Sequence, residues 1–76
     1  MGERLELYGT RSCAFTAELR EQLLWERREF VEYDVETDPE ALSRMVQLTG
    51  GRRMVPVLVE EGQVKQVGHR GHGCPV

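Results

Sequence analysis

The sequence predicts one α/β domain, with a mixed four-stranded sheet and two helices in the order β-α-β-α-β-β. Two observations carry this prediction. Segments rich in strand-forming residues alternate with segments of helical periodicity, and a turn-type Glu61-Gly62 pair separates the last two strand segments. A strand-helix-strand crossover joins parallel strands, whereas a hairpin joins antiparallel strands, so the sheet must be mixed. With 76 residues, the chain has room for one such domain.

The first half of the chain reads as strand, helix, strand. Leu5–Tyr8 is a short strand candidate that ends at Gly9-Thr10. From residue 14 to residue 27 there is neither Gly nor Pro, which favours a helix. Apolar residues recur there every four positions: Phe15, Leu19 and Leu23. That spacing predicts one apolar helical face, and residues 30–35 predict the second strand.

The second half reads as helix, strand, strand. Asp38-Pro39 predicts a helix start, with Asp as the N-cap and Pro in the first helical position. A mostly apolar stripe follows at helical spacing: Leu42, Met45, Val46 and Thr49. Gly50-Gly51 predicts the end of this helix. Residues 55–59 and 63–67 are the third and fourth strand candidates.

The composition is that of a soluble globular protein, with 39% apolar residues, 30% charged residues and a formal net charge of -3. This acidic balance argues against a nucleic-acid-binding surface, which usually needs a basic excess. No apolar run approaches the ~20 residues that cross a bilayer. The segment Met1–Arg4 lacks the hydrophobic stretch of a signal peptide. We therefore expect a cytoplasmic protein without nucleic-acid or membrane partners.

Cys13 is the strongest candidate for chemistry. It lies between the first strand and the first helix, where unpaired backbone N–H groups and the helix dipole favour a nucleophilic thiolate. Arg11, two residues earlier, could add a positive charge. The alternative is a buried structural cysteine, but loops of this kind lie at the exposed edge of a sheet. Thr16, one helical turn later, could hydrogen-bond the thiolate or simply occupy an early helical position.

Residues 1–68 are predicted to form the domain, and residues 69–76 a Gly/His/Cys tail without a further helix. A solvated tail is one interpretation. Metal ligation is another, with these ligands: Cys13, His69, His72 and Cys74. The third interpretation makes Cys74 a second redox thiol, because six residues beyond Gly68 can span ~20 Å when extended. A permanent structural disulfide is less expected in a reducing cytosol.

Val55-Pro56 begins the third strand candidate. Proline has no N–H for a strand ladder, so its presence predicts an edge, a bulge or a turn. From the residues alone, a trans bond before this proline is the default.

From about residue 5 to residue 68, the chain resembles the glutaredoxins, which have the thioredoxin fold. The resemblance rests on the run Leu-Tyr-Gly-Thr-Arg-Ser-Cys-Ala-Phe-Thr at 7–16, on Asp34-Val35 followed by Asp38-Pro39-Glu40, and on residues 49–57. The Cys-x-x-Thr motif and the Gly-Cys-Pro-Val ending are also similar to small glutaredoxin-like proteins called UXX-star. In some of those proteins, selenocysteine occupies the position of the nucleophile.

The resemblance implies roles for individual residues. Cys13 is implied to attack disulfides, and the Val55-Pro56 bond is implied to be cis. The glutathione-binding residues implied by the match are Arg11, Phe15, Arg53, Val55 and Pro56. Among these, the Val55 backbone would pair with the cysteinyl part of glutathione, Arg11 would lie near its carboxylate, and Phe15 would flank the active cysteine.

The chain also departs from the glutaredoxin pattern. Thr16 replaces the resolving cysteine, which makes the motif monothiol, and Met54 replaces the usual threonine. His69 and Arg70 stand where an acidic residue usually binds the amino end of glutathione. The chain stops before the usual final helix, which could expose apolar sheet surface and favour a weak homodimer over a monomer.

We therefore expect a glutaredoxin-like thiol-disulfide oxidoreductase that acts on glutathione or protein disulfides. The Cys13 thiolate would form a mixed disulfide, which either glutathione as co-substrate or Cys74 would resolve. The alternative is a carrier that binds an iron–sulfur cluster or a metal through Cys13. Cluster-binding monothiol relatives usually have Gly-Phe-Ser after the cysteine, where this chain has Ala-Phe-Thr at 14–16. Because of that difference, we rank the carrier function below the oxidoreductase function.

Overall fold

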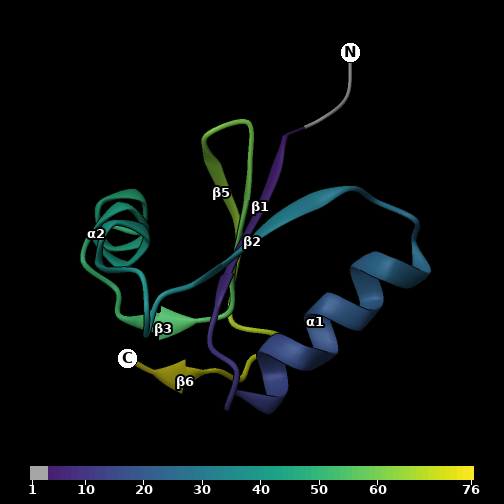
Figure 1. The fold of residues 1–76 in the computed structure, drawn as a ribbon, viewed down its shortest axis with the longest axis horizontal. Coiled ribbons are helices and arrows are strands. Elements are labelled where there is room, and N and C mark those ends of the chain that lie inside the picture. Colours follow the sequence, from purple (N-terminus) through teal and green to yellow (C-terminus); the bar gives the residue numbers. More distant parts are fainter. Residues whose placement is uncertain (1–3) are drawn as a thin grey trace.

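The computed structural model describes residues 4–76, and it confirms the predicted α/β class (Figure 1). The elements are β1 Leu5–Gly9, α1 Ala14–Trp25, β2 Phe30–Asp34, α2 Pro39–Leu48, β3 Met54–Val55, β4 Val57–Glu60, β5 Gln63–Val67 and β6 Cys74–Pro75. Residues 1–3, part of the segment considered for a signal peptide, lie outside the described residues. Within residues 4–76, no helix has the length and apolar character needed to span a membrane.

The central sheet has the strand order β2-β1-β4-β5. β1 and β2 are parallel, as expected for two strands joined through a helix, whereas β1–β4 and β4–β5 are antiparallel. β1 therefore lies between a parallel and an antiparallel neighbour. The mixed four-stranded sheet predicted from the sequence is confirmed.

The two helices cover opposite faces of this sheet (Figure 1). Alternate residues of a strand point to opposite faces, and β1 shows this alternation directly. Leu7 packs with Leu19 and Leu23 of α1, while Tyr8 packs in a second cluster with Met45 of α2. All of these side chains are buried, so the domain has one apolar layer on each side of the sheet.

The buried stripe of α1 differs from the predicted one at its first residue. Thr16 is fully buried beside Leu19 and Leu23, whereas Phe15 is only half-buried. The reason lies in β1, because a Cβ atom on Gly9 would come 2.2 Å from the Thr16 Cγ2 atom. The missing side chain at Gly9 lets the first turn of α1 approach the strand with Thr16 facing inward.

The second helix begins and ends where the sequence predicts. The Asp38 carboxylate accepts a hydrogen bond from the Ala41 amide at 3.2 Å, and Pro39 occupies the first helical position. At the other end, the Gly51 amide donates to the Val46 carbonyl at 2.8 Å. These side-chain and backbone contacts satisfy polar groups that a helix leaves unpaired at its ends.

The third predicted strand, over residues 55–59, is two strands in the structure. Pro56 has no N–H to donate and separates β3 from β4. β4 stays in the central sheet beside β1, while β3 pairs with β6 in a separate two-stranded sheet. The break at Pro56 therefore frees β3 to bind another strand.

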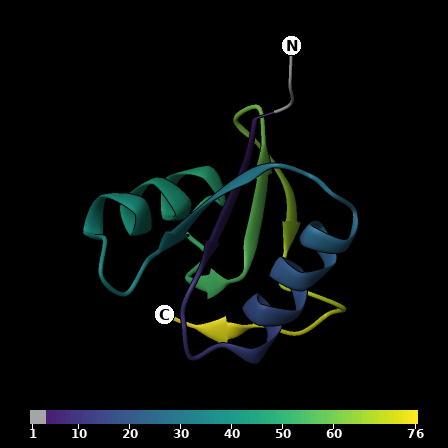
Figure 2. The ribbon, with the colours of Figure 1, turned by 45° about the vertical axis from the view of Figure 1, so that its right-hand side comes forward.

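The residues expected to form a tail are folded. His69 and His72 form an antiparallel bridge, and the two residues between them, Arg70 and Gly71, have positive φ values of 53° and 79°. This is the conformation of a tight two-residue hairpin turn. His69 is 4% exposed and contacts Gln66, so the solvated-tail interpretation is wrong for this part of the chain. The hairpin turns the chain back so that β6 lies beside β3 (Figure 2).

Tyr8 makes the stability of the domain sensitive to alkaline pH. Burial, together with the nearby Glu6 carboxylate that accepts a hydrogen bond from the phenol at 3.1 Å, raises the pKa of Tyr8 to about 12. In the unfolded chain the phenol ionises near pH ~10. The folded state is therefore favoured fully below about pH 10, and this contribution, up to about 2 kcal/mol, is lost as the pH rises toward about 12.

Urea unfolding of the oxidised protein at increasing pH measures this effect. The wild type is expected to lose stability between about pH 10 and about pH 12, and Tyr8→Phe to show a flatter profile because it has no phenol to ionise. Parallel profiles for the two proteins would contradict this role for Tyr8.

Candidate active site

The two cysteines are joined by a disulfide bond that links the start of α1 to β6. Cys13 and Cys74 are 61 positions apart in the sequence, and their Cα atoms are separated by 6.1 Å. This distance lies in the ordinary range for bridged cysteines. Among the interpretations of Cys74, the structure thus favours a thiol that can react with Cys13.

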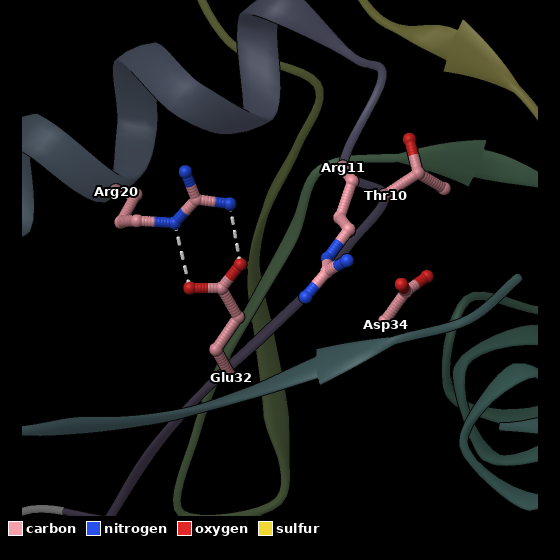
Figure 3. Close-up of a pocket in the computed structure, with 6 residues that line it drawn as sticks. Thr10, Arg11, Arg20, Glu32 and Asp34 are labelled. Atoms are coloured by element: carbon pink, nitrogen blue, oxygen red, sulfur yellow. Dashed lines mark hydrogen bonds and ion pairs between the residues drawn. The ribbon is translucent and has the colours of Figure 1, made fainter. Parts of the chain in front are cut away.

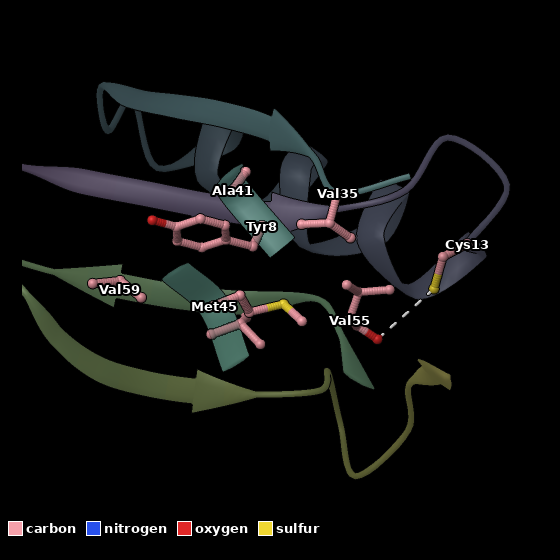
Figure 4. Packing of buried hydrophobic residues seen from close by; sticks show 8 residues of the cluster. Tyr8, Cys13, Val35, Ala41, Met45, Val55 and Val59 are labelled. Atoms are coloured by element: carbon pink, nitrogen blue, oxygen red, sulfur yellow. Dashed lines mark hydrogen bonds between the residues drawn. The ribbon is translucent and has the colours of Figure 1, made fainter. Parts of the chain in front are cut away.

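Cys13 is the N-cap residue of α1. Its backbone is extended, and its carbonyl oxygen accepts a hydrogen bond from the Ala17 amide at 3.2 Å. The first turn of α1 contains no acidic residue that would offset the positive end of the helix dipole. Cys13 is 2% exposed, and its Sγ atom lies 4.0 Å from the Val55 carbonyl oxygen (Figure 4). Reduction would therefore place a thiolate at a helix terminus that stabilises negative charge.

Cys74 is held in place by strand pairing between β3 and β6. Val55 is opposite Cys74 and Met54 is opposite Pro75, in antiparallel register. The Val55-Pro56 peptide bond is cis, as the resemblance to glutaredoxins implied. Val55 thus lies beside both cysteines, since its carbonyl oxygen approaches Cys13 and its backbone pairs with Cys74.

The segment beyond Cys74 is anchored by Arg53. The Arg53 carbonyl accepts a hydrogen bond from the Val76 amide at 3.0 Å, and the Arg53 Nε atom donates to the Val76 carbonyl at 2.8 Å. Arg53 was expected from the resemblance to bind glutathione. In the disulfide-bonded structure, the same side chain instead donates a hydrogen bond to the C-terminal segment of the chain.

The His69–His72 hairpin is also held against α1 and against Pro56, the residue that follows β3. The rings of Phe15 and His72 are stacked, with centroids 5.3 Å apart and an angle of 18° between the planes. At the base of the hairpin, the Gly68 amide donates to the Pro56 carbonyl at 2.7 Å. Phe15 packs, partly buried, against the core cluster that contains Cys13. Its role toward glutathione stays a prediction.

Thr16 lies one turn beyond Cys13, but it is fully buried against Gly9. Within residues 4–76, its hydroxyl oxygen has no hydrogen-bond partner in the disulfide-bonded state. A buried hydroxyl without a partner costs free energy. The proposed hydrogen bond from Thr16 to a Cys13 thiolate stays a prediction about the reduced protein.

The Arg11 side chain faces carboxylates of β2. Its side chain lines an open pocket of about 370 Å³ at the ends of β1 and β2, where Figure 3 shows it between the Arg20–Glu32 ion pair and Asp34. Neither cysteine lines this pocket. The local sequence spacing placed the Arg11 charge close to the thiolate, but the structure turns it toward the carboxylates of β2. A role of Arg11 toward glutathione stays a prediction.

The four residues of the metal-binding interpretation are not brought together. The two sulfur atoms are bonded to each other, His72 stacks on Phe15, and His69 faces Glu18 at 4.0 Å and Gln66. In the part of the chain from residue 4 onward, no group of three or more His, Cys, Asp or Glu side chains is arranged to hold a metal ion. These residues, as they stand in the oxidised protein, do not fit a metal site.

Sequence reasoning missed two contributors to this site. The ring of His72 supports the hairpin through Phe15, and Gly73 approaches β3 closely. A signal for the hairpin was present in Arg70-Gly71, a residue pair suited to a tight turn, flanked by two histidines. No local pattern indicates that the returning arm pairs with β3, because two-residue strands leave no periodicity to detect.

The fold is a mixed sheet between two helices. It brings a cysteine at the start of the first helix together with a second cysteine opposite the residue before a cis-proline. These features define a thiol redox protein of the thioredoxin fold. The glutaredoxin family model matches residues 5–65, and the chain belongs to the glutaredoxin family. This membership supports a function in thiol redox chemistry.

Comparison with solved structures agrees with this fold. The chain is similar to the thioredoxin-like protein BC3987, in the crystal structure of a point mutant of that protein, with a TM-score of 0.74 and 24% sequence identity. The match covers 83% of this chain and 80% of that protein. No functionally curated protein matches the sequence.

The contact between Arg53 and Val76 is expected to stabilise the disulfide-bonded form. Replacing Arg53 by Ala removes a hydrogen bond at an exposed position, so the internal disulfide should become about two- to fivefold easier to reduce. Equilibration with reduced and oxidised dithiothreitol measures this change. Arg52→Ala is the matched control, because the Arg52 side chain is also exposed and Val76 bonds to Arg53 instead. Equal equilibria for the two variants would contradict an anchoring role for Arg53.

Proposed function

We propose that this protein is a thiol-disulfide oxidoreductase in which Cys13 is the nucleophile and Cys74 the resolving cysteine. The observation that carries the proposal is the disulfide between these residues, which is held by the pairing of β3 with β6. The Cys-x-x-Thr motif lacks a resolving cysteine within α1, and β6 supplies a cysteine from the other end of the chain. The motif at the start of α1 therefore contains one cysteine, whereas the proposed reaction uses two.

The first step uses the position of Cys13 at the N-terminus of α1. The Cys13 thiolate attacks one sulfur of a substrate disulfide, forms a mixed disulfide with that sulfur, and releases the other sulfur as a thiolate. Helix-terminal N–H groups stabilise the attacking thiolate before the reaction. Substrate disulfides are those of glutathione or of proteins.

In the second step, β6 returns to β3 and the Cys74 thiolate attacks the Cys13 sulfur. The bond from Cys13 to the substrate breaks, the substrate leaves as a thiolate, and the Cys13–Cys74 disulfide forms. Two electrons have passed from the two cysteines to the substrate disulfide. Strand pairing at Val55 aligns Cys74 for this attack.

Reduction of the protein begins at Cys74. Cys13 is 2% exposed in the disulfide, whereas Cys74 is half-buried and lies on the outer strand. An incoming thiolate, with glutathione as the reductant that we propose, attacks the Cys74 sulfur and releases Cys13 as a thiolate. That direction also gives the better leaving group, because the helix N-terminus stabilises Cys13. A second thiol then frees Cys74.

Thr16 contributes to the reduced state. Its hydroxyl is buried and has no partner within the described residues while the disulfide is closed. When Cys13 becomes a thiolate, this hydroxyl donates a hydrogen bond to the sulfur, and the cost of leaving the hydroxyl unpaired is relieved. Thr16 thereby favours the nucleophilic form of Cys13.

We place this chemistry in the cytoplasm, in a protein that is a monomer or a weak homodimer.

The assignment of the two cysteines is tested by intact mass after reduced protein is mixed with oxidised glutathione and quenched with acid. The wild type is expected to end as the internal disulfide. Cys74→Ser should stop at a glutathione adduct on Cys13, because no second thiol can displace glutathione. Cys13→Ser is the control and should react far more slowly through Cys74.

A wild-type protein that accumulates the glutathione adduct as fully as Cys74→Ser would contradict the resolving role of Cys74. Rapid adduct formation in Cys13→Ser would instead contradict the choice of nucleophile.

Thr16→Val separates the role of the hydroxyl in stability from its role in reactivity. The oxidised protein should become about 1 kcal/mol more stable to urea, because an unpaired buried hydroxyl is replaced by a methyl group of similar shape. The reduced protein should lose reactivity. In the Cys74→Ser background, alkylation of Cys13 by iodoacetamide near neutral pH should be about tenfold slower, because a hydrogen bond to the thiolate is missing. An unchanged pH profile of alkylation would exclude this contact.

A further inference from the structure

An open groove of about 330 Å³ lies between α1 and the His69–His72 hairpin. Four of its lining residues come from one face of α1, and two come from the hairpin: Glu18, Glu21, Gln22, Trp25, His69 and Arg70. The four α1 residues follow one another at spacings of three and four, which places them side by side on the helix. Neither cysteine lines this groove, so it is separate from the disulfide.

Trp25 forms one end of the groove. It is the only tryptophan of the chain, and it is 85% exposed. Tryptophan is the side chain whose ring attracts a cation most strongly. The Glu21 side chain lies one helical turn before Trp25, and Glu18 lies one turn before Glu21. The ring and the two carboxylates, which outnumber the guanidinium of Arg70, therefore favour a cationic side chain such as arginine or lysine.

His69 adds a hydrogen-bond donor to the wall of the groove. The Gln66 amide nitrogen donates to the Gly68 carbonyl at 2.9 Å and also lies 3.3 Å from His69 Nδ1. Because that nitrogen is a donor, Nδ1 accepts, and the neutral imidazole carries its proton on Nε2. Within residues 4–76 this N–H makes no hydrogen bond, since the Glu18 Oε1 atom is 4.0 Å away. His69 is 4% exposed, so a ligand with an acceptor oxygen would satisfy a donor that is almost fully buried.

We propose that this groove binds a basic polypeptide segment of a protein thiol that reduces the Cys13–Cys74 disulfide. An arginine or lysine side chain lies on Trp25 between the carboxylates, and a main-chain carbonyl accepts from His69. The carboxylates of Glu18 and Glu21 disfavour phosphate groups, which excludes nucleic acids and anionic lipid headgroups as ligands. The protein partner acts in addition to glutathione, which is too small to reach both the groove and the disulfide.

The groove lies within reach of the disulfide because both are next to the same elements. Cys13 precedes α1 and Trp25 ends it, so the 12-residue helix separates them by ~18 Å. The hairpin contributes His69 to the groove, while its His72 ring stacks on Phe15, two positions after Cys13. An extended chain of about six residues spans ~20 Å, which is enough to join a thiol at the disulfide to a cation in the groove.

The inference rests on the proposed function, in which reduction begins at Cys74. The partner thiolate attacks the Cys74 sulfur, the bond between Cys74 and Cys13 breaks, and Cys13 leaves as a thiolate. A second partner thiolate then attacks the partner's sulfur in the mixed disulfide and releases Cys74 as a thiolate. The partner leaves as a disulfide, and its two electrons have passed to the two cysteines. Binding in the groove holds the partner beside Cys74 during the first attack.

Reduction of the oxidised full-length protein by designed thiol peptides tests the proposal. Each peptide has a single cysteine, a linker of about six Gly and Ser residues that spans ~20 Å, and a terminal Arg-Arg, Gln-Gln or Glu-Glu pair. Each is made with the pair on either side of the cysteine. The peptides are used in excess at low ionic strength, and loss of the internal disulfide is followed by intact mass after acid quenching. Glutathione is measured in parallel.

In the better of the two orders, the Arg-Arg peptide should reduce the wild type about five- to tenfold faster than the Gln-Gln peptide, and the Glu-Glu peptide should be slowest. Trp25→Ala and Glu21→Gln should each lower this ratio to about twofold. Leu24→Ala is the control for Trp25, because Leu24 is a neighbouring exposed residue that does not line the groove. Glu40→Gln is the control for Glu21, because it removes the same charge from α2, at the opposite face of the sheet (Figure 1). Both controls should keep the ratio of the wild type.

Equal rates with the Arg-Arg and Gln-Gln peptides in both orders would overturn the groove and leave the proposed function standing. An equal loss of preference in Glu21→Gln and Glu40→Gln would also overturn it, because net charge alone would then attract the peptide. If neither the peptides nor glutathione opened the disulfide, the proposed function would fail and this inference with it.

Discussion

The pairing of β6 with β3 is the contact on which the candidate active site depends. Each strand contributes two residues, so the backbone pairing alone is small. It is reinforced from three directions: by the disulfide, by Arg53 on Val76, and by Phe15 stacked on His72. Because one of these supports is a covalent bond that reduction breaks, the stability of the whole assembly is linked to the redox state of the two cysteines.

The position of α1 sets the other half of the site. Thr16 packs into the space left by the missing side chain of Gly9, and this brings the first turn of the helix against β1. The N-cap residue Cys13 is thereby placed beside Val55, with its sulfur 4.0 Å from the Val55 carbonyl oxygen. The packing leaves the Thr16 hydroxyl buried and unpaired within the described residues. The oxidised state therefore carries a cost in free energy that a Cys13 thiolate could relieve, and this cost opposes the stabilising contacts of β6.

The proposed redox cycle follows from the way β6 covers β3 in the oxidised protein. In the oxidised protein the C-terminal segment itself occupies the edge of β3, with Arg53 and Val55 engaged. In the proposed cycle, an external thiol reaches Cys74 first, and an external disulfide reaches Cys13 only after this segment has left β3.

The amino-acid sequence by itself determined the order of the first four elements, the caps of α2 and the place of Cys13 before α1, because periodicity, capping and turn formation are local. It also supported membership of the glutaredoxin family through motifs at several places along the chain. Only the tertiary structure decided that the strand breaks at Pro56, that Thr16 rather than Phe15 begins the buried stripe, and that Arg11 faces the carboxylates of β2. The Cys13–Cys74 pair belongs to this second group. Its two members are 61 positions apart in the sequence. They meet through backbone pairing between β3 and β6, which any residues of extended conformation could make. For this reason, no side-chain pattern predicts the contact.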